Sequence, residues 1–269
     1  MKTNLNIAAT ITATTRFIEE KLLGSGLDGF ILGLSGGIDS ALSAALAAKA
    51  VGAEKVLGVM MPYRTSADAS VADAKGLAEK LGIDTRLVDI SPMIDAYYPV
   101  IDKNNALRAG NKMARERMSI LFDIAHESNS LVLGTGNRTE ICLGYTTWFG
   151  DSACSINPLG ELYKCEVRLL ARELGIPDSI LEKPPSADLW AGQTDEAEIG
   201  VTYDTIDALL RLIVDEGVVS ISTLAKRGFA ETDISRVVSL MNRFSFKRRL
   251  PDIAPVGRKA IPNDIQLQS

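Results

Sequence analysis

The residues with the clearest potential for chemistry are residues 34–40, which read Leu-Ser-Gly-Gly-Ile-Asp-Ser. The paired glycines let backbone N–H groups come close to a ligand, and the two serines add hydroxyl donors. If a helix starts here, its N-terminus adds a partial positive charge that favours a phosphate or pyrophosphate. Asp39 would repel such a ligand unless a divalent cation lay between them, so the segment also predicts Mg²⁺.

Other interpretations of this segment are weaker. A Walker A loop needs a lysine after its glycines and a dinucleotide fingerprint needs GxGxxG, and residues 34–40 match neither pattern. The structural alternative is a helix capped by Ser35 or Asp39, with the glycines forming only a tight turn. The combination SGGxDS between a strand and a helix favours the anion site over this alternative.

Rare residue types exclude several other chemistries. His126 is the single histidine, so multi-histidine metal sites and paired-histidine catalysis are excluded. The three cysteines form no CxxC pair, which argues against a disulfide framework or a zinc ribbon. With 29 Lys and Arg against 34 Asp and Glu, the formal charge is −5, which argues against a protein that coats nucleic acid.

Targeting signals are equally sparse in the sequence. It contains no uninterrupted run of about 18 apolar residues, the length that a membrane span requires. Polar residues between positions 4 and 16 interrupt any signal-peptide core. We therefore expect a cytoplasmic protein with reduced cysteines and no membrane partner.

The elements that must position residues 34–40 alternate between helices and short apolar strands. We expect helices over 4–24, 41–51, 67–81 and about 112–126, and strands over 29–34, 56–61, 85–90 and 130–134. This alternation predicts an α/β protein with an open parallel sheet and helices on both faces. The segment 34–40 then lies at the carboxyl end of the first strand, where ligands bind in such sheets.

The second part of the chain is predicted to be helical. The expected helices are 164–174, 197–215, 219–227 and 230–243. After Pro251 the composition favours an irregular tail, over about 252–269. We expect a single domain over residues 1–269 with a helical C-terminal portion.

Residues 34–40 resemble the PP-loop of the N-type ATP pyrophosphatases, which cleave ATP to AMP and pyrophosphate. This resemblance implies a Rossmann-like fold of the adenine nucleotide alpha hydrolase type, with ATP as co-substrate. The residues that it assigns to ATP binding in the loop are Gly33, Leu34, Ser35, Gly36, Gly37, Ile38, Asp39 and Ser40.

Six further segments resemble NAD synthetases, and the similarity extends from about residue 4 to Pro251. These segments are residues 110–118, 133–140, 144–151, 158–164, 185–189 and 193–196. The resemblance is closest to the ammonia-using form, because the glutamine-dependent form carries an additional nitrilase-like domain for which this length leaves no room. It implies a C–N ligase that amidates deamido-NAD to NAD with ammonia, and a homodimer.

The resemblance also assigns roles outside the loop. It implies ATP contacts at Thr135, Lys164 and Ser186, the last at a position where the family usually has threonine. It implies that Glu140 holds magnesium together with Asp39. From the residues alone, Glu140 could be a solvated side chain at a helix start, and Lys164 a surface lysine opening the helix 164–174. A cation is unfavourable at a helix N-terminus unless an anion lies there, which weakens the second alternative.

On the substrate side, the resemblance implies four contacts, at Arg115, Trp148, Ser155 and Lys247, and the sequence departs from the family pattern at three positions. Arg115 matches an arginine that contacts the dinucleotide across the dimer, although it also belongs to a run of basic residues. Lys247 matches a lysine near the substrate but could equally belong to a cluster of surface charges. Asp151 is retained and is expected to orient substrate or ammonia. The three departures are Trp148 for a lysine, Ser155 for an aspartate and Phe246 for a histidine. Trp148 could stack on a ring of the substrate or simply pack in its loop.

The expected reaction forms an adenylate of the nicotinate carboxylate and releases pyrophosphate, after which ammonia displaces AMP. The expected catalytic set is Asp39, Glu140, Asp151 and Lys164, acting by positioning and charge neutralisation. Two alternatives stay open, namely another AMP-forming PP-loop enzyme, such as one that modifies tRNA, and a non-catalytic adenine-nucleotide-binding protein. Whether a separate glutaminase supplies ammonia is also open.

Overall fold

The computed structural model describes residues 5–97, 105–186, 194–254 and 256. Its centre is a parallel four-stranded sheet with the order β3-β2-β1-β4. The strands are β1 (Gly29–Gly33), β2 (Val56–Met60), β3 (Asp84–Leu87) and β4 (Ser130–Val132). In the register, Phe30 of β1 lies opposite Val56 of β2 and Leu131 of β4.

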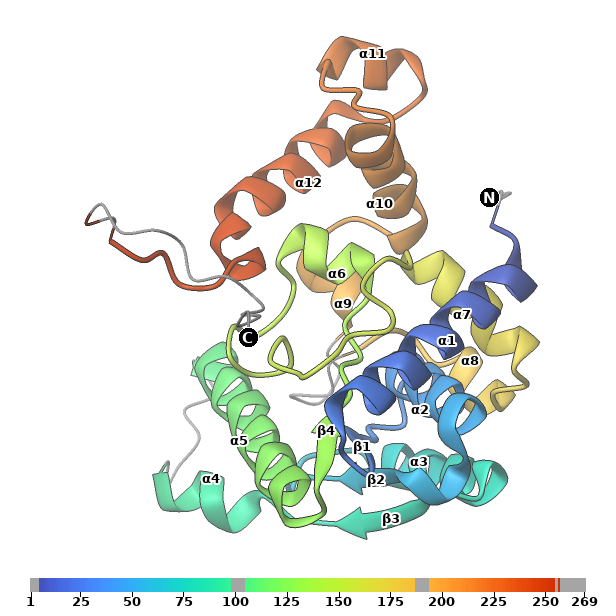
Figure 1. Ribbon diagram of the computed structural model, residues 1–269. Helices are drawn as coiled ribbons and strands as arrows, with labels where there is room; N and C mark the ends of the chain where they lie inside the picture. Colours follow the sequence, from blue (N-terminus) through green and yellow to red (C-terminus); the bar gives the residue numbers. More distant parts are fainter. Residues whose placement is uncertain (1–4, 98–104, 187–193, 255, 257–269) are drawn as a thin grey trace.

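Helices cover both faces of this sheet, as the alternating pattern predicts (Figure 1). Alternate residues of a strand point to opposite faces. Phe30 and Leu32 therefore pack with α1 (Ile7–Ser25), α2 (Ile38–Val51), α3 (Asp68–Leu81) and α7 (Lys164–Glu173). Ile31 packs on the other side with α4 (Ser91–Tyr97) and α5 (Ala106–Glu127). Each face thus carries its own apolar core.

The order of the strands places two loops opposite each other. The chain runs from β1 outward through β2 to the edge strand β3, and then returns through α4 and α5 to β4 on the other side of β1. The direction of winding therefore reverses between β1 and β4. In parallel sheets, ligands bind outside the carboxyl ends of strands at such a reversal. The loops that follow β1 and β4 meet at this point.

The bounds of several elements differ from those that the sequence suggests. Helix α2 begins at Ile38 rather than Ala41, because Gly37 is its N-cap and Asp39 lies in its first turn. All four residues of β3 are exposed, and this edge strand ends at Leu87. The sequence analysis did not anticipate the short helices α4, α6 (Arg138–Leu143) and α8 (Asp178–Leu181).

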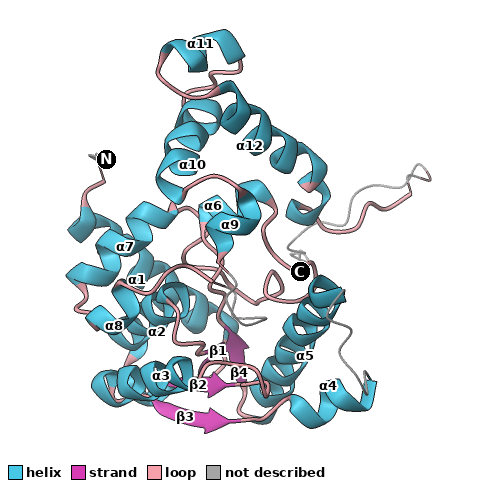
Figure 2. Ribbon diagram, turned by 180° about the vertical axis from the view of Figure 1, so that it is seen from behind, coloured by secondary structure: helices cyan, strands magenta, loops and turns pink. Residues whose placement is uncertain are grey.

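The C-terminal helices form a second body that projects from the sheet (Figures 1 and 2). They are α9 (Asp195–Ile199), α10 (Tyr203–Leu210), a π-helical turn (Arg211–Asp215), α11 (Ile221–Lys226), α12 (Glu231–Arg243) and a 3₁₀ turn (Ser245–Arg248). The single helix expected over 197–215 is wrong, because Gly200 adopts a φ of +82° and ends α9. Residues 252–254 and 256 have no helix or strand, and the rest of the predicted tail lies outside the described residues. Within the ranges given above, no helix is both long and apolar enough to cross a membrane.

Candidate active site

The loop between β1 and α2 has a conformation that depends on glycine. Gly36 has a φ of +75°, and a Cβ at this position would lie only 2.2 Å from the carbonyl oxygen of Ser70 on α3. The hydroxyl of Ser40 is buried, accepts a hydrogen bond from the Ser35 N–H (3.2 Å) and donates one to the Gly37 carbonyl (3.0 Å). The two serine hydroxyls also lie 3.0 Å apart. The loop is therefore held in one shape at the N-terminus of α2, as an anion site requires.

Two carboxylates and one ammonium group meet beside this loop. The Lys164 Nζ donates to Asp39 Oδ2 at 2.6 Å and to Glu140 Oε1 at 3.1 Å. The Lys164 side chain is 3% exposed, against 19% for Asp39 and 15% for Glu140. Lys164 lies on α7, Asp39 on α2 and Glu140 on α6. Asp39 and Lys164 are 125 residues apart in the sequence. The structure thus brings together three of the four residues that the sequence analysis expected to be catalytic.

Asn137 joins the two carboxylates, and the sequence analysis did not single it out. Its Nδ2 donates to Asp39 Oδ1 (2.9 Å), and its Oδ1 accepts from the Glu140 N–H (3.0 Å). The Glu140 carboxylate in turn accepts from the Asn137 N–H (3.2 Å), which completes a capping box at the start of α6. The signal in the sequence was the spacing Asn-x-x-Glu, which is typical of a helix start. Glu140 is therefore fixed by α6 instead of being a freely solvated side chain.

The charges in this cluster are unbalanced. Burial raises the pKa of Glu140 to about 8, the ammonium of Lys164 counteracts this rise, and the charge of Asp39 adds to it. Burial alone would lower the pKa of Lys164, but the carboxylates of Asp39 and Glu140 outweigh burial and raise it above its ordinary value. With both carboxylates ionised, the three groups carry an excess negative charge, which a divalent cation would offset.

This donor set fits Mg²⁺ better than a metal that needs an all-protein cage. Mg²⁺ is commonly held by one or two carboxylates together with water and the phosphates of a substrate. Asp39 and Glu140 offer such a pair, and Lys164 already bridges their oxygens. Among the described residues, no three or more His, Cys, Asp or Glu side chains are grouped so that they could hold a metal ion. A metal here would therefore take its remaining ligands from water and the phosphates of a substrate.

The backbone of Lys164 is anchored from the C-terminal helices. Its N–H donates to the Thr139 hydroxyl (3.0 Å), and that hydroxyl donates to Asp207 Oδ1 on α10 (2.6 Å). The other oxygen of Asp207 accepts from the Cys165 N–H (2.8 Å). Asp207 is fully buried and thus holds the start of α7 against α6. The second body of the fold therefore positions a residue of the candidate site.

A buried aromatic residue covers the other side of the ammonium group. The Lys164 Nζ lies 5.1 Å from the centre of the Tyr203 ring, within the range of a cation–π interaction. The Tyr203 hydroxyl donates to Asp195 Oδ2 (3.0 Å), and Tyr145 donates to Asp195 Oδ1 (3.3 Å). Asp195 belongs to the segment 193–196 singled out in the sequence, of which Gln193 lies outside the described residues.

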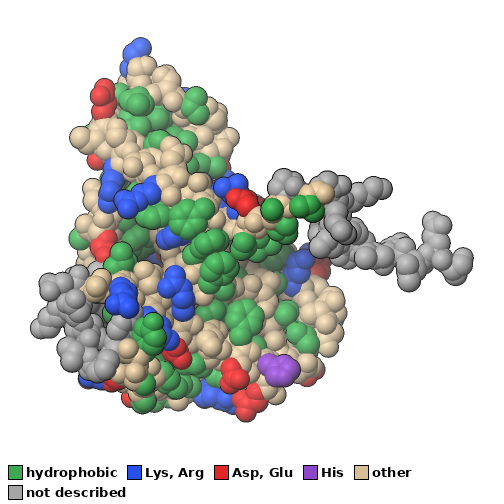
Figure 3. Space-filling view, turned by 90° about the vertical axis from the view of Figure 1, so that its left-hand side faces the viewer, with side chains coloured by type: hydrophobic (Ala, Val, Ile, Leu, Met, Phe, Trp, Pro, Cys, Tyr) green, Lys and Arg blue, Asp and Glu red, His purple; other side chains and the backbone are tan. Residues whose placement is uncertain are grey.

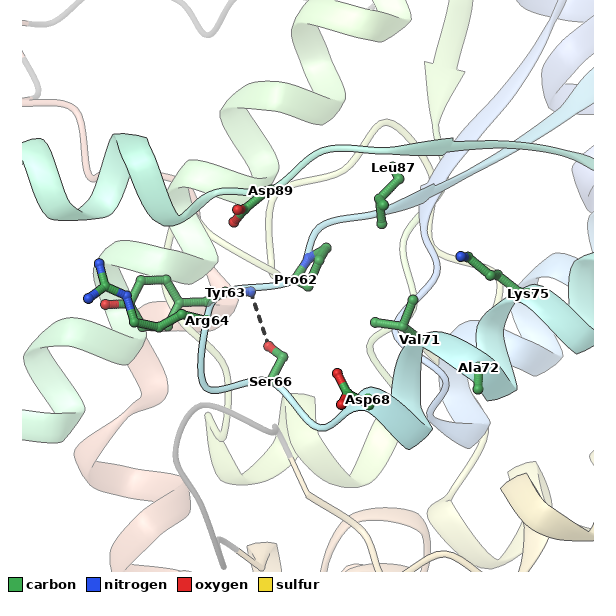
Figure 4. A pocket seen from close by; sticks show the side chains of 10 residues that line it. All are labelled: Pro62, Tyr63, Arg64, Ser66, Asp68, Val71, Ala72, Lys75, Leu87 and Asp89. Atoms are coloured by element: carbon green, nitrogen blue, oxygen red, sulfur yellow. Dashed lines mark hydrogen bonds between the residues drawn. The ribbon is translucent and has the colours of Figure 1, made fainter.

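A cavity of about 440 Å³ opens next to the loop, at the carboxyl ends of β2 and β3. One wall is α3, with Asp68, Val71 and Lys75, and the opposite wall follows β3, with Leu87 (Figure 4). The segment after β2 closes one end, where the Tyr63 N–H donates to the Ser66 hydroxyl (3.1 Å). Its lining is part apolar and part charged. The sequence analysis did not identify this cavity, because its walls come from separate segments.

The substrate residues expected from the resemblance gather in a second place, around residues 144–151. The Arg115 Nε on α5 donates to the carbonyl oxygen of Trp148 (3.2 Å). The Trp148 ring stacks on Phe149, with centroids 4.3 Å apart, and meets the Phe246 ring edge-on at 5.2 Å. Two of the three positions that depart from the family pattern, Trp148 and Phe246, therefore touch each other. Trp148 thus packs with aromatic neighbours in its loop.

Lys247 and Asp151 support the same loop. The Lys247 Nζ donates to the carbonyl oxygens of Thr146 (2.6 Å) and Gly144 (2.9 Å). Burial lowers the pKa of Lys247, as does the nearby charge of Arg115, while Asp151 opposes both effects. The Asp151 carboxylate accepts from the Thr147 N–H (2.7 Å). Lys247 is thus a part-buried side chain that stabilises the loop through hydrogen bonds, which contradicts the alternative of a solvated surface charge.

The remaining expected residues lie apart from these two groups or at their margins. The Ser155 hydroxyl accepts from the Val132 N–H (3.1 Å) and so extends the end of β4. Thr135 is half-buried in the loop after β4, and Ser186 is exposed after α8. The neighbouring residues 187–189, which form part of the resemblance, lie outside the described residues.

The sequence and the fold are similar to those of known enzymes. The family model described as NAD synthase matches residues 10–251. Over 257 residues, the chain is 47% identical to an NH(3)-dependent NAD(+) synthetase of Fusobacterium nucleatum, covering 96% of this chain and 99% of that protein.

Solved structures agree with this similarity. The structure of NMN synthetase from Francisella tularensis superposes with a TM-score of 0.81 at 33% identity, covering 94% of this chain and 100% of that chain. The structure of an NH3-dependent NAD synthetase from Campylobacter jejuni, in complex with the nitrate ion, superposes with a TM-score of 0.79 at 32% identity. This match covers 93% of this chain and 100% of that chain. Both likenesses extend over the sheet and the C-terminal helices.

Proposed function

The chain belongs to the NAD synthase family, and from this premise we propose how its residues catalyse ammonia-dependent NAD synthesis. The observation that carries the proposal is the meeting of Asp39, Glu140 and Lys164 beside the 34–40 loop. That arrangement places a helix N-terminus, two carboxylates and a cation where a nucleotide pyrophosphate would be bound. A passive nucleotide-binding protein does not explain why these three residues converge from three helices. A tRNA-modifying enzyme is disfavoured instead by the net charge of −5, because binding of nucleic acid needs a cationic surface.

The reaction has two steps. The nicotinate carboxylate of deamido-NAD attacks the α-phosphorus of ATP, the bond from that phosphorus to the bridging oxygen breaks, and pyrophosphate leaves. Ammonia then attacks the carbonyl carbon of the adenylate, AMP leaves with the electrons of the C–O bond, and the nitrogen loses one proton. The backbone N–H groups of residues 36–38 would hold the leaving pyrophosphate, and Lys164 would neutralise its developing charge.

We assign magnesium binding to Asp39 and Glu140. When bound with ATP, Mg²⁺ supplies charge neutralisation of the phosphates. Asn137 would keep both carboxylates turned toward the ion, because it is hydrogen-bonded to each of them. Lys164 bridges these two carboxylates, and it would exchange them for the phosphates if a metal were bound there. Metal and nucleotide are thus expected to bind together.

We place the adenosine of ATP in the cavity at the ends of β2 and β3. The cavity lies along α3, whose Ser70 packs against Gly36 of the loop. The dinucleotide substrate would bind from the side of residues 144–151, with Arg115, Trp148 and Lys247 as its contacts and Asp151 orienting it. As the resemblance implies, we also assign Ser155 as a contact to the dinucleotide substrate and Ser186 as a contact to ATP.

The homodimer and the cytoplasmic location also belong to the proposal. The face that carries α4 and α5 mixes apolar side chains with Lys and Arg (Figure 3). On α5, Leu107 is 67% exposed and Phe122 is 44% exposed, which favours a partner subunit on this helix. A cavity of about 610 Å³ between Tyr97 and Arg115 lies on the same helix and would take part of a shared substrate site.

The test of the function is pyrophosphate release by the purified protein. Incubated with MgATP, deamido-NAD and ammonium, the protein should release pyrophosphate and form NAD and AMP in equal amounts. Omission of any one substrate should abolish NAD formation. Nicotinate mononucleotide is the competing acceptor, since one structural neighbour is an NMN synthetase. ATP binding without acceptor-dependent pyrophosphate release would contradict the proposal.

A separate measurement tests the metal ligands. We expect Mn²⁺, followed by electron paramagnetic resonance, to bind the wild-type protein weakly alone and much more tightly with a non-hydrolysable ATP analogue. Lys164→Met should strengthen binding without nucleotide at least about tenfold, because it frees both carboxylates for the ion. Adding Asp39→Asn to that variant should abolish the gain. Equal Mn²⁺ binding by wild type and Lys164→Met would show that the metal lies elsewhere.

A further inference from the structure

Lys183, just after α8, lies on the candidate site without any role in the catalytic set described above. Its Nζ donates to the Ser70 hydroxyl (2.8 Å) and lies 3.5 Å from Asp73 Oδ2. Both partners are on the first two turns of α3. The Lys183 side chain therefore reaches from the C-terminal half of the chain onto the helix that borders the cavity.

Ser70 connects the two parts of the proposed ATP site. Its main chain packs against Gly36, so closely that a Cβ on Gly36 would lie 2.2 Å from the Ser70 oxygen. The next residue, Val71, lines the cavity at the ends of β2 and β3 (Figure 4). A nucleotide with its adenosine in that cavity and its pyrophosphate in the loop must pass over Ser70. The α-phosphate, which joins the adenosine to the pyrophosphate, would cross there, and the Lys183 ammonium is hydrogen-bonded to the hydroxyl of the same Ser70.

Charge favours a second cation at this place. The triphosphate is highly anionic, whereas Lys164 is held between two carboxylates and the loop offers only backbone N–H and hydroxyl groups. Arg64, at the far end of the cavity, is paired with Asp95. Lys183 is held less firmly, because its side chain is 30% exposed, its hydrogen bond is to the neutral hydroxyl of Ser70, and the Asp73 carboxylate is 3.5 Å away. A flexible lysine with such partners can exchange them for a phosphate oxygen.

We propose that Lys183 moves away from Ser70 and Asp73 and binds the α-phosphate of ATP. There its ammonium group would neutralise charge at the phosphorus under attack. The proposal rests on the proposed function for the identity of the nucleotide and the position of its adenosine. It assigns to the segment after α8 a direct part in the first chemical step. Ser70 and Asp73 are the partners that the ammonium group would give up when it binds the phosphate.

The test compares three variants of the whole protein. Lys183→Met should lower kcat/KM for ATP about 10- to 100-fold, the range for loss of a charged group that acts on the transition state. Lys183→Arg should restore much of this loss, since it keeps the charge. Lys80→Met is the matched control, because Lys80 is a lysine of α3 itself that binds a carbonyl oxygen, that of Gly175, away from the loop. It should stay within about twofold of wild type in kcat/KM.

Two further readouts separate phosphate contact from a structural role. The slowing caused by α-thio-substituted ATP should be smaller in Lys183→Met than in wild type, and the melting temperature and the KM for deamido-NAD should hardly change. The affinity for α,β-methylene ATP, measured by calorimetry, should fall in parallel with kcat/KM. That binding measurement remains decisive even if the wild-type protein releases no pyrophosphate. A Lys183→Met variant that matches Lys80→Met in affinity and kcat/KM, or that loses only thermal stability, would overturn the proposal.

Discussion

Lys164 has two roles, since it balances the charge of two carboxylates and is proposed to bind the phosphates of ATP. Two buried carboxylates side by side are unfavourable without a cation, and the Lys164 ammonium lies 2.6 Å from one and 3.1 Å from the other. The sequence analysis noted that a lysine at a helix N-terminus requires an anion nearby. In the structure that anion is supplied by Asp39 and Glu140 of the protein itself. A metal that enters with ATP would take over this role and free Lys164 for the phosphates.

The pKa of Glu140 leads to a prediction about stability and pH. Burial raises this pKa from 4.5 to about 8, so the folded protein keeps a proton that the unfolded chain releases above pH 4.5. The free energy of unfolding should therefore fall as the pH rises from about 5 to 8. In Glu140→Gln this contribution is absent, so its stability should fall less over the same range.

Urea denaturation of the metal-free protein between pH 5 and 8, in the presence of EDTA, measures this difference. Plotted against pH, the free energy of unfolding of the wild-type protein should approach or drop below that of Glu140→Gln as the pH increases. Parallel curves for the two proteins would contradict the expected protonation of Glu140. Saturating Mg²⁺ and ATP should remove the effect, because a bound metal favours the ionised carboxylate.

At the scale of elements, the decisive unit is the turn from β1 into α2. The strand ends at Gly33, the helix begins at Ile38, and Gly36 between them packs directly on Ser70 of α3. Because Gly36 adopts a φ of +75°, this turn has a shape that other residues rarely adopt. The exposed edge strand β3 and the broken helix at Gly200 had weaker local signals, so their bounds were predicted less well.

Gly36→Ala tests this turn. A methyl group would clash with the Ser70 main chain and disfavour the left-handed backbone, which should cost about 1–3 kcal/mol in stability. ATP affinity should fall more than the affinity for deamido-NAD, because the loop would open locally. Gly76→Ala in α3 is the matched control, since no atom lies within 4 Å of its added Cβ. That control should be neutral or slightly stabilising. Equal ATP affinities in both variants would show that the loop shape is not required.

At the scale of the whole molecule, the C-terminal helices are part of the candidate site. Asp207 of α10 is fully buried and joins Thr139 of α6 to the first turn of α7, which carries Lys164. The two bodies of the fold are thus connected through the residues that position the lysine. The family similarity likewise extends through both bodies, to residue 251.

Asp207→Ala should therefore affect both stability and catalysis. Loss of a buried carboxylate that accepts two hydrogen bonds should cost about 1–3 kcal/mol in the free energy of unfolding. The variant should also lose kcat, because Lys164 is no longer held toward the loop. Asp204→Ala on the same helix is the control, since its side chain is 76% exposed and lies 3.8 Å from Arg168. Denaturation and steady-state kinetics of both variants would measure the effect, and equal kinetics would contradict it.

The net charge of −5 takes on a clearer meaning at this scale. ATP and deamido-NAD are both anions, so attraction by the whole protein does not explain their binding. Local features must overcome the general repulsion, namely the 34–40 loop, the metal carboxylates and single cations such as Lys164 and Lys183. Binding should for this reason depend on individual side chains more than on overall charge.

The sequence by itself determined the sheet and the loop between the first strand and helix, whereas most candidate residues outside that loop were implied by the resemblance to a known family. Local patterns suffice for these features, because strand and helix periodicity and the SGGxDS turn depend on neighbouring residues. Only the tertiary structure decided that Lys164 bridges Asp39 and Glu140, that Asn137 and Asp207 fix them, and that Lys183 lies at Ser70. These contacts join segments up to 125 residues apart, and no local pattern encodes such pairings. They arise because the strand order reverses next to β1 and brings distant loops to one edge of the sheet.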